Sequence, residues 1–266
     1  MKLPFNIASR FFSLILILTC YVGGAGCSTC NNCKIATPAH HKPLTYVIVH
    51  GAWGGGWDWR QVDDALTAAG NKVYRPTLTG QGERSHLSNT NIDLSLHIQD
   101  IVNVILWEDL HDVVLVGHSY GGMVITGVAD RVPDRIKQII YLDALVPLDG
   151  ESANDIRSRT GIDRPIRDGY VIPTWIKGDE AIPHDVLQPA KTFSERIALT
   201  NQVAAAKIPT TYILTVDKGK TPDQDEFYSF YLRAKGRNWP VQIMEGDHNV
   251  QRSHLSDLVR RLETTP

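Results

Sequence analysis

The sequence predicts an α/β fold, in which a mostly parallel sheet carries helices on both faces. Short apolar runs rich in β-branched residues are typical of buried strands. These runs are residues 44–49, 72–78, 112–117, 136–142, 210–216 and 241–244. In the first half of the chain they alternate with helical segments, which favours parallel strands joined by crossover helices. The roughly 225 residues after the N-terminal segment are enough for one such domain.

The expected helices follow from apolar spacing and from their end signals. The first runs from Trp57 to Ala69, with Gly70 and Asn71 as its stop. The others are expected at residues 92–108, from residue 123 to about residue 131, and at about 253–262.

The alternation is interrupted at about residues 147–206. This stretch contains Pro165, Pro173, Pro183 and Pro189 but no clear strand pattern, so we expect an inserted, mostly helical cap. Its large apolar residues either face a substrate or simply pack the cap against the core: Tyr170, Ile172, Trp175, Ile176 and Phe193.

The N-terminus predicts export. Lys2 and Arg10 precede an apolar stretch of about a dozen residues, which is too short for a membrane span but suits a signal peptide. We expect a signal peptide at 1–26, a flexible tether at 27–43 and the main domain at 44–266. Gly24-Ala25-Gly26-Cys27 resembles a bacterial lipoprotein processing site, so the mature protein is expected in the periplasm, either free or anchored to the membrane through a lipid on Cys27.

The composition excludes several classes of function. A formal net charge of −2 without a basic stripe argues against nucleic acid as a partner. All 4 cysteines lie at or before Cys33, so the domain from residue 34 onward has neither a disulfide nor a cysteine nucleophile. Cys27, Cys30 and Cys33 have no partner cysteine pair for a structural zinc site. His40 and His41 could complete a ligand set, but the stretch between them and the cysteines is expected to be a flexible tether, so we expect no metal or other cofactor.

The pentapeptide Gly117-His118-Ser119-Tyr120-Gly121 is the most informative motif. It reads G-x-S-x-G and stands between an expected strand and an expected helix, where a tight turn would expose the serine hydroxyl. The alternative is a chance serine in a glycine-rich turn. The setting favours a nucleophile elbow with Ser119 as the nucleophile.

A serine nucleophile needs a base and an acid. Among 10 histidines, His248 follows the last expected strand, whereas His50 and His118 are better placed to shape loops. Since the acid comes between serine and histidine in proteins with this elbow, Asp217 is the expected acid and Asp143 its competitor. Each could instead be a surface carboxylate or a helix cap.

The oxyanion formed during attack needs two backbone donors. We expect the N–H of Tyr120 and the N–H of Ala52. The alternative for the glycines at 54–56, a phosphate-binding loop, lacks the lysine and the spacing of a P-loop.

Several motifs together resemble the α/β-hydrolase superfamily over residues 44–264. Residues 47–52 with 57–59, and residues 77–86, are similar to the branch of plant methyl esterases, hydroxynitrile lyases and small bacterial esterases. Segments 217–219 and 246–248 resemble the acid and histidine segments of that branch. The resemblance implies Ser119, Asp217 and His248 as a triad without a metal or organic cofactor.

The resemblance also implies a reaction. Related lyases carry a lysine after the histidine and a threonine in the first loop, where this chain has Asn249 and Ala52. We therefore expect hydrolysis of a small, partly apolar carboxylic ester through an acyl-enzyme. Alternatives are a lactone or amide hydrolase, or a small-molecule receptor on the same scaffold without turnover.

Overall fold

The structure of the protein is a computed structural model that describes residues 42–157, 165–173 and 175–265. The predicted signal peptide, most of the predicted tether and Cys27 lie outside the described residues. Among the residues that are described, none of the helices has both the length and the apolar character that a bilayer crossing requires.

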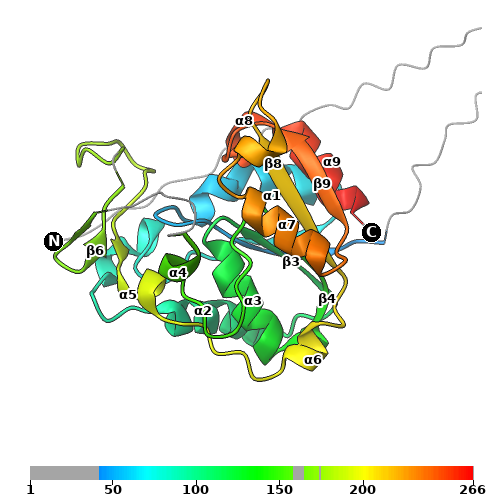
Figure 1. Cartoon of the computed structure of the whole chain (residues 1–266), viewed down its shortest axis with the longest axis horizontal. Coiled ribbons are helices and arrows are strands. Elements are labelled where there is room, and N and C mark those ends of the chain that lie inside the picture. The colour runs from blue at the N-terminus through cyan, green and yellow to red at the C-terminus, as the bar shows by residue number, and fades with distance from the viewer. Residues whose placement is uncertain (1–41, 158–164, 174, 266) are drawn as a thin grey trace, which may run out of the picture. The chain divides into compact units, whose positions relative to one another are not determined.

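A sheet of 6 parallel strands forms the centre of the domain, in the order β2-β1-β3-β4-β8-β9 (Figure 1). The predicted strands are all present, with these bounds: β1 Thr45–Val49, β2 Lys72–Tyr74, β3 Val113–His118, β4 Ile136–Leu142, β8 Thr210–Val216 and β9 Val241–Glu245. Strand β2 ends four residues before the expected Leu78. Pro76 has no N–H to donate to a neighbouring strand, and the Leu78 N–H donates to the His50 ring instead (3.1 Å).

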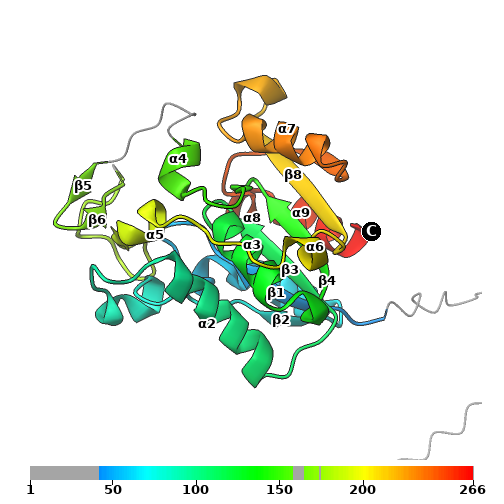
Figure 2. The same cartoon turned by 60° about the horizontal axis from the view of Figure 1, so that its bottom comes forward.

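Helices cover both faces of this sheet, as predicted. Neighbouring strand residues alternate between two apolar clusters, which therefore lie on opposite faces. Residues of α2 (Leu94–Trp107), α3 (Gly121–Arg131) and α7 (Tyr228–Gly236) belong to one cluster. Residues of α1 (Arg60–Ala68), α8 (Val250–Ser253) and α9 (Leu255–Thr264) belong to the other. Figure 2 shows α2 and α3 together on the near side of the strands.

Local signals explain where these helices begin and end. Asp93 accepts a hydrogen bond from the Leu96 N–H (2.9 Å) and so caps the first turn of α2. After α1, Gly70 has a φ of 92° and the Asn71 N–H donates to the Leu66 carbonyl, which ends the helix at the predicted place.

The cap differs from the expected mostly helical insertion. Its helices are short: α4 Ala153–Arg157, α5 Lys191–Ser194 and α6 Gln202–Ala205. Its described residues also form an antiparallel sheet of 3 strands: β5 Ile166–Arg167, β6 Tyr170–Val171 and β7 Gln188–Pro189. Asp168 and Gly169, with φ of 50° and 81°, form the two-residue turn between β5 and β6. Asp-Gly is a favoured pair for such a hairpin turn, and this signal in the sequence was missed.

The parallel strands bring distant segments to one edge of the sheet. The loop from His50 to Trp53 follows β1, and Ser119 follows β3. Asp143 follows β4, and His248 lies in the segment after β9. A crevice beyond the carboxyl ends of parallel strands is where α/β proteins bind their ligands.

Candidate active site

Ser119 stands on a tight turn between β3 and α3. Its φ is 55°, a left-handed backbone conformation that a residue other than glycine rarely adopts. The Ser119 carbonyl accepts hydrogen bonds from the Gly122 N–H (3.1 Å) and the Leu145 N–H (3.0 Å), which hold this conformation. The turn also needs glycine beside it, since a Cβ on Gly121 would lie 2.6 Å from the Val49 carbonyl oxygen. The strained turn that the motif predicts is present.

His248 forms a hydrogen-bonded pair with Asp143. The His248 Nδ1 lies 2.6 Å from the Asp143 Oδ2. The Asp143 side chain is 1% exposed, and its other oxygen accepts the Thr215 N–H at 3.1 Å. Burial raises the pKa of Asp143 above its usual value, whereas the Thr215 hydrogen bond acts in the opposite direction. A buried carboxylate held in this way fixes one tautomer of the imidazole, with the proton on Nδ1 and Nε2 unprotonated.

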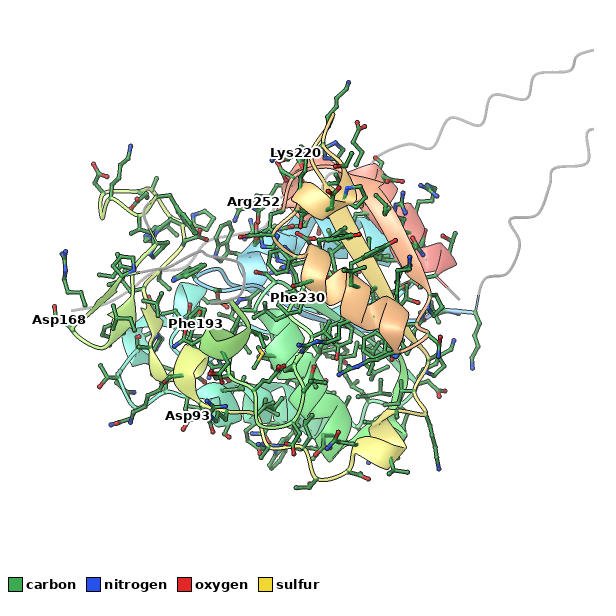
Figure 3. The ribbon with its side chains drawn as sticks, in the orientation of Figure 1. Asp93, Asp168, Phe193, Lys220, Phe230 and Arg252 are labelled. Atoms are coloured by element: carbon green, nitrogen blue, oxygen red, sulfur yellow. The ribbon has the colours of Figure 1, made fainter. Side chains whose placement is uncertain are left out.

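The structure corrects the expectation that Asp217 pairs with His248. The Asp217 side chain is 47% exposed and binds Lys220 at 2.7 Å, on the loop beyond the end of β8. Figure 3 shows Lys220 on this loop, at the periphery of the domain. The reason lies in the backbone: Asp143 has a φ of 45° and its N–H donates to the Ile213 carbonyl, which leaves its carboxylate beneath the histidine. Asp217 still acts on the pair through its charge, which helps to raise the pKa of Asp143.

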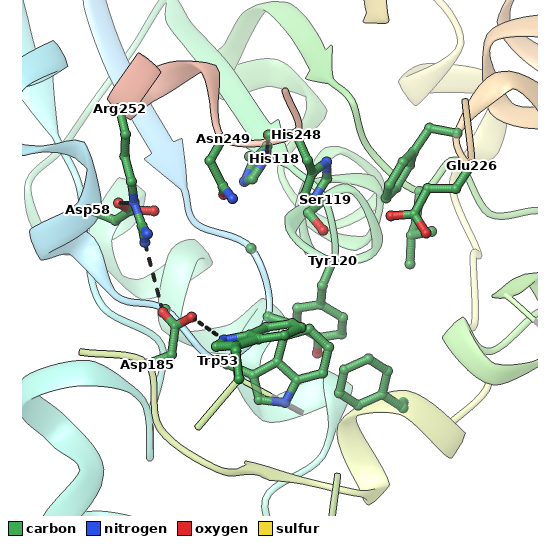
Figure 4. A pocket seen from close by; sticks show the side chains of 17 residues that line it. Trp53, Asp58, His118, Ser119, Tyr120, Asp185, Glu226, His248, Asn249 and Arg252 are labelled. Carbon is green, nitrogen blue, oxygen red and sulfur yellow. Dashed lines mark hydrogen bonds and ion pairs between the residues drawn. The ribbon is translucent and has the colours of Figure 1, made fainter. Parts of the chain in front are cut away.

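Ser119 and His248 line the same cavity, whose volume is about 280 Å³. Figure 4 shows the Ser119 hydroxyl and the His248 ring at the centre of this cavity. The His248 ring is stacked between Phe227 (centroids 4.8 Å apart) and His118 (4.5 Å). The stack and the pair with Asp143 fix the orientation of the ring.

The two expected oxyanion donors also belong to the lining of this cavity. Ala52 and Tyr120 both line it, and within the described residues neither backbone N–H has a hydrogen-bond partner. His50 shapes the Ala52 loop, as expected: its Nδ1–H donates to the Gly51 carbonyl (2.7 Å), and its Nε2 accepts the Leu78 N–H. Two unpaired amides beside a serine are the kind of donors that stabilise an oxyanion.

His118 holds the backbone of His248 in place. Its Nε2–H donates to the His248 carbonyl (2.8 Å), and its side chain is buried under the elbow. Burial, together with the nearby His248, lowers the pKa of His118 to about 4. His118 is therefore neutral at pH 7 and does not repel a positive charge that forms on His248.

Several cavity residues had no clear signal in the sequence. Of the cap residues considered above, Trp175 and Phe193 line the cavity. The lining also includes Trp53, Asp58, Leu145, Asp185, Glu226, Phe227, Asn249 and Arg252. Asn249 and Arg252 could have been noticed from their places soon after His248, whereas Leu145, Asp185 and Glu226 come from distant loops. The part of the chain that the structure describes contains no cluster of histidine, cysteine and carboxylate side chains able to hold a metal ion.

Comparison with known proteins places this site in a family. Residues 46–261 match the profile described as "Alpha/beta hydrolase family". The chain belongs to the α/β-hydrolase family. The match covers nearly the whole central sheet of this α/β hydrolase, together with Ser119, Asp143 and His248.

Individual relatives and one solved structure agree with this placement. Pheophorbidase of Raphanus sativus is 35% identical over 244 residues, covering 80% of this chain and 90% of that protein. "Carbendazim hydrolyzing esterase" of Nocardioides is 56% identical over 107 residues, which cover 40% of this chain but only 44% of that enzyme. An extracellular α/β-hydrolase from a Paenibacillus species has a TM-score of 0.62 and 26% identity over 82% of this chain and 97% of its own. The esterase among these relatives supports carboxylic ester hydrolysis by this α/β hydrolase.

Proposed function

We propose that this protein is a serine hydrolase of small carboxylic esters, with Ser119 as nucleophile, His248 as base and Asp143 as acid. One observation carries the proposal. A buried carboxylate orients a histidine that shares a cavity with a serine on a strained elbow, beside two unpaired backbone N–H groups. The Nocardioides esterase supports the same reaction class.

The proposed reaction has two halves. The Ser119 Oγ attacks the ester carbonyl carbon, and its proton passes to the His248 Nε2. The oxyanion accepts hydrogen bonds from the Ala52 and Tyr120 N–H groups. When the oxyanion collapses, the C–O bond to the alcohol breaks and His248 protonates the leaving alkoxide. A water molecule then attacks the acyl-enzyme by the same route and releases the acid and free Ser119.

The size and lining of the cavity support a small, partly apolar substrate. A volume of about 280 Å³ is near the lower end for ligand pockets. Trp53, Phe193, Tyr120 and Leu145 provide apolar surface around Ser119. We therefore expect short acyl chains to be turned over faster than long ones.

Substitution of the nucleophile tests the proposal. We expect Ser119→Ala to lower kcat/KM for short p-nitrophenyl esters at least about a thousandfold, because the acyl-enzyme can no longer form. The thermal unfolding midpoint should stay close to that of the wild type. A serine-directed fluorophosphonate should label the wild type and not the variant. Wild-type turnover in Ser119→Ala would contradict the proposal, and a panel of lactones and amides would show whether another acyl bond is preferred.

Export and lipidation of Cys27 remain proposals that rest on the N-terminal sequence alone. Mass spectrometry of the mature N-terminus tests both. An unmodified N-terminal residue would contradict lipidation, and an intact Met1 in the mature protein would contradict signal cleavage.

A further inference from the structure

Aromatic side chains form a continuous wall along one side of the candidate active site. The Trp53 ring lies 5.3 Å from the Trp175 ring, edge to face, and 5.7 Å from the Phe193 ring. Phe193 in turn lies 5.3 Å from Tyr120, the residue after the nucleophile. Phe227, which is stacked on His248, also lines the cavity. A group bound beside Ser119 therefore lies among aromatic rings, whose faces carry partial negative charge.

The charged side chains of the same cavity are mostly acidic. Asp58, Asp185 and Glu226 line it, and within the part of the chain that the structure describes Arg252 is the one lysine or arginine in the lining. Figure 4 shows the Glu226 carboxylate on one side of Ser119 and the Asp185 carboxylate on the other. Among the described lining residues, three carboxylates against one guanidinium give a formal excess of two negative charges near Ser119.

Arg252, the described cation of the lining, is already engaged. Arg252 contacts the Asp58 carboxylate, lies 3.9 Å from Asp185 and stands over the Trp57 ring at 5.1 Å. Asp58, whose side chain is 8% exposed, is its main partner. Within the described residues, Glu226 is exposed and has no hydrogen bond or ion pair. The positive charge of Arg252 is therefore directed toward Asp58, and the carboxylate of Glu226 faces the cavity without a cation.

We propose that the site selects esters that carry a positively charged group, such as a quaternary ammonium, and discriminates against esters that carry a carboxylate or sulfonate. Aromatic faces and carboxylates together attract a cation that has lost part of its water. The same charges repel the carboxylate that ester hydrolysis produces, which favours release of the acid. This inference rests on the proposed esterase function but adds a substrate class that the function alone does not require.

Isosteric substrates separate charge from shape. The first pair places the charge in the acid: methyl trimethylammonioacetate against methyl 3,3-dimethylbutanoate. The second pair places it in the alcohol: 2-(trimethylammonio)ethyl acetate against 3,3-dimethylbutyl acetate. After normalisation to the rate of hydroxide hydrolysis, we expect kcat/KM to favour the cationic ester in at least one pair by about threefold to thirtyfold. The anionic 2-sulfoethyl acetate should be slower than both esters of the second pair.

Charge-removing variants link the preference to these residues. Glu226→Gln and Asp185→Asn should each lower severalfold the ratio of kcat/KM for the cationic ester to kcat/KM for the neutral ester. The intrinsic reactivity of the esters cancels when this ratio is compared between a variant and the wild type. Asp64→Asn is the matched control, because Asp64 is an exposed carboxylate on α1 that does not line the cavity. The ratio in this control should equal that of the wild type.

The outcomes separate the two proposals. The cation inference is overturned if neutral esters are turned over and neither pair shows a preference for the cationic ester. It is also overturned if a preference exists that neither cavity variant reduces. Both results leave the proposed esterase function standing. Absence of turnover for every ester overturns the proposed function. In that case the thermal unfolding midpoint, measured in tetramethylammonium chloride and in sodium chloride, tests the cation site without any turnover. A higher midpoint in tetramethylammonium chloride that Glu226→Gln reduces supports the cation site. Equal midpoints in the two salts overturn the cation site.

Discussion

Asp143 and Asp217 follow neighbouring strands of the sheet, yet they have different surroundings. Asp143 is buried, accepts the Thr215 N–H and holds the His248 Nδ1 at 2.6 Å. Asp217 is half exposed and paired with Lys220. A carboxylate that must stabilise an imidazolium acts most strongly from a buried position, where water does not screen it. At the residue scale the geometry therefore favours Asp143 as the acid of the proposed mechanism.

Matched substitutions of the two aspartates test this assignment. Asp143→Asn should lower kcat by about ten thousandfold, because the amide no longer holds the tautomer that leaves Nε2 as the base. Asp217→Asn should lower kcat less than about tenfold, since it removes only a nearby charge that is screened by solvent. Initial rates with a short p-nitrophenyl ester measure both. A larger loss of kcat from Asp217→Asn than from Asp143→Asn would assign the role of the acid to Asp217 instead.

Sequence patterns could place Ser119 and His248 but not choose between the two aspartates. The serine is specified locally, by glycines that only a tight strand-to-helix turn requires. The choice of acid depends on the φ of Asp143 and on the Thr215 N–H, which comes from a strand 72 residues away. No local pattern encodes such a contact, so both residues follow a strand equally well in the sequence.

At the element scale, α3 comes unusually close to neighbouring backbone. A Cβ on Gly122, in the first turn of α3, would lie 2.0 Å from the Leu145 carbonyl oxygen. A Cβ on Gly121 would meet the Val49 carbonyl, so α3 is held against β1 and against the segment after β4. This close approach places the elbow beside Asp143. The elements were predictable from apolar runs, and the hairpin turn at Asp168-Gly169 had a local signal that was missed. The close approach was not predictable, because it depends on backbone geometry rather than on apolar period.

Two glycine-to-alanine variants test the close approach. Gly122→Ala should destabilise the fold by about 2 kcal/mol or more, because backbone must move to admit the methyl group. Gly236→Ala, at the end of α7, should be neutral or stabilising by up to about 1 kcal/mol, since nothing lies within 4 Å of its Cβ position and alanine favours helix. Urea unfolding measures both. Equal stability of the two variants would contradict the contact between α3 and the Leu145 carbonyl.

At the scale of the whole molecule, buried histidines make folding depend on pH. His50, His97 and His118 are all fully buried, and burial is the main cause that lowers the pKa of each. Each ring has at least one nitrogen hydrogen-bonded to a polar partner that suits the neutral form. In His97 the Nε2–H donates to the Thr79 carbonyl (3.0 Å) and Nδ1 lies 3.1 Å from the Tyr120 hydroxyl. Protonating these rings in the folded protein costs free energy, so the stability of the whole domain falls at a pH where the unfolded chain binds those protons.

The sign of the effect follows from proton linkage. In the unfolded chain a histidine binds a proton as the pH falls below about 6.5, whereas burial holds His97 neutral down to about 3. Between these values the unfolded state binds more protons than the folded state. The stabilising contribution of neutral His97 is therefore complete above about pH 6.5 and is lost as the pH falls toward 3. Asp143, whose pKa is raised, acts in the opposite sense over part of this range, so a variant of His97 is needed to isolate one group.

We expect His97→Gln to make the protein less sensitive to acid, whatever its stability at pH 7. Glutamine can keep polar contacts at this position but does not titrate. Between about pH 5.5 and 4, the slope of unfolding free energy against pH should be smaller in the variant by about 1.4 kcal/mol per pH unit, which corresponds to one proton. Urea unfolding over this range measures the slope. Calorimetry in buffers of different ionisation enthalpy measures the protons directly, and unfolding of the variant near pH 5 should take up about one proton fewer. Parallel stability curves and equal proton uptake would show that His97 does not stay neutral in the folded protein.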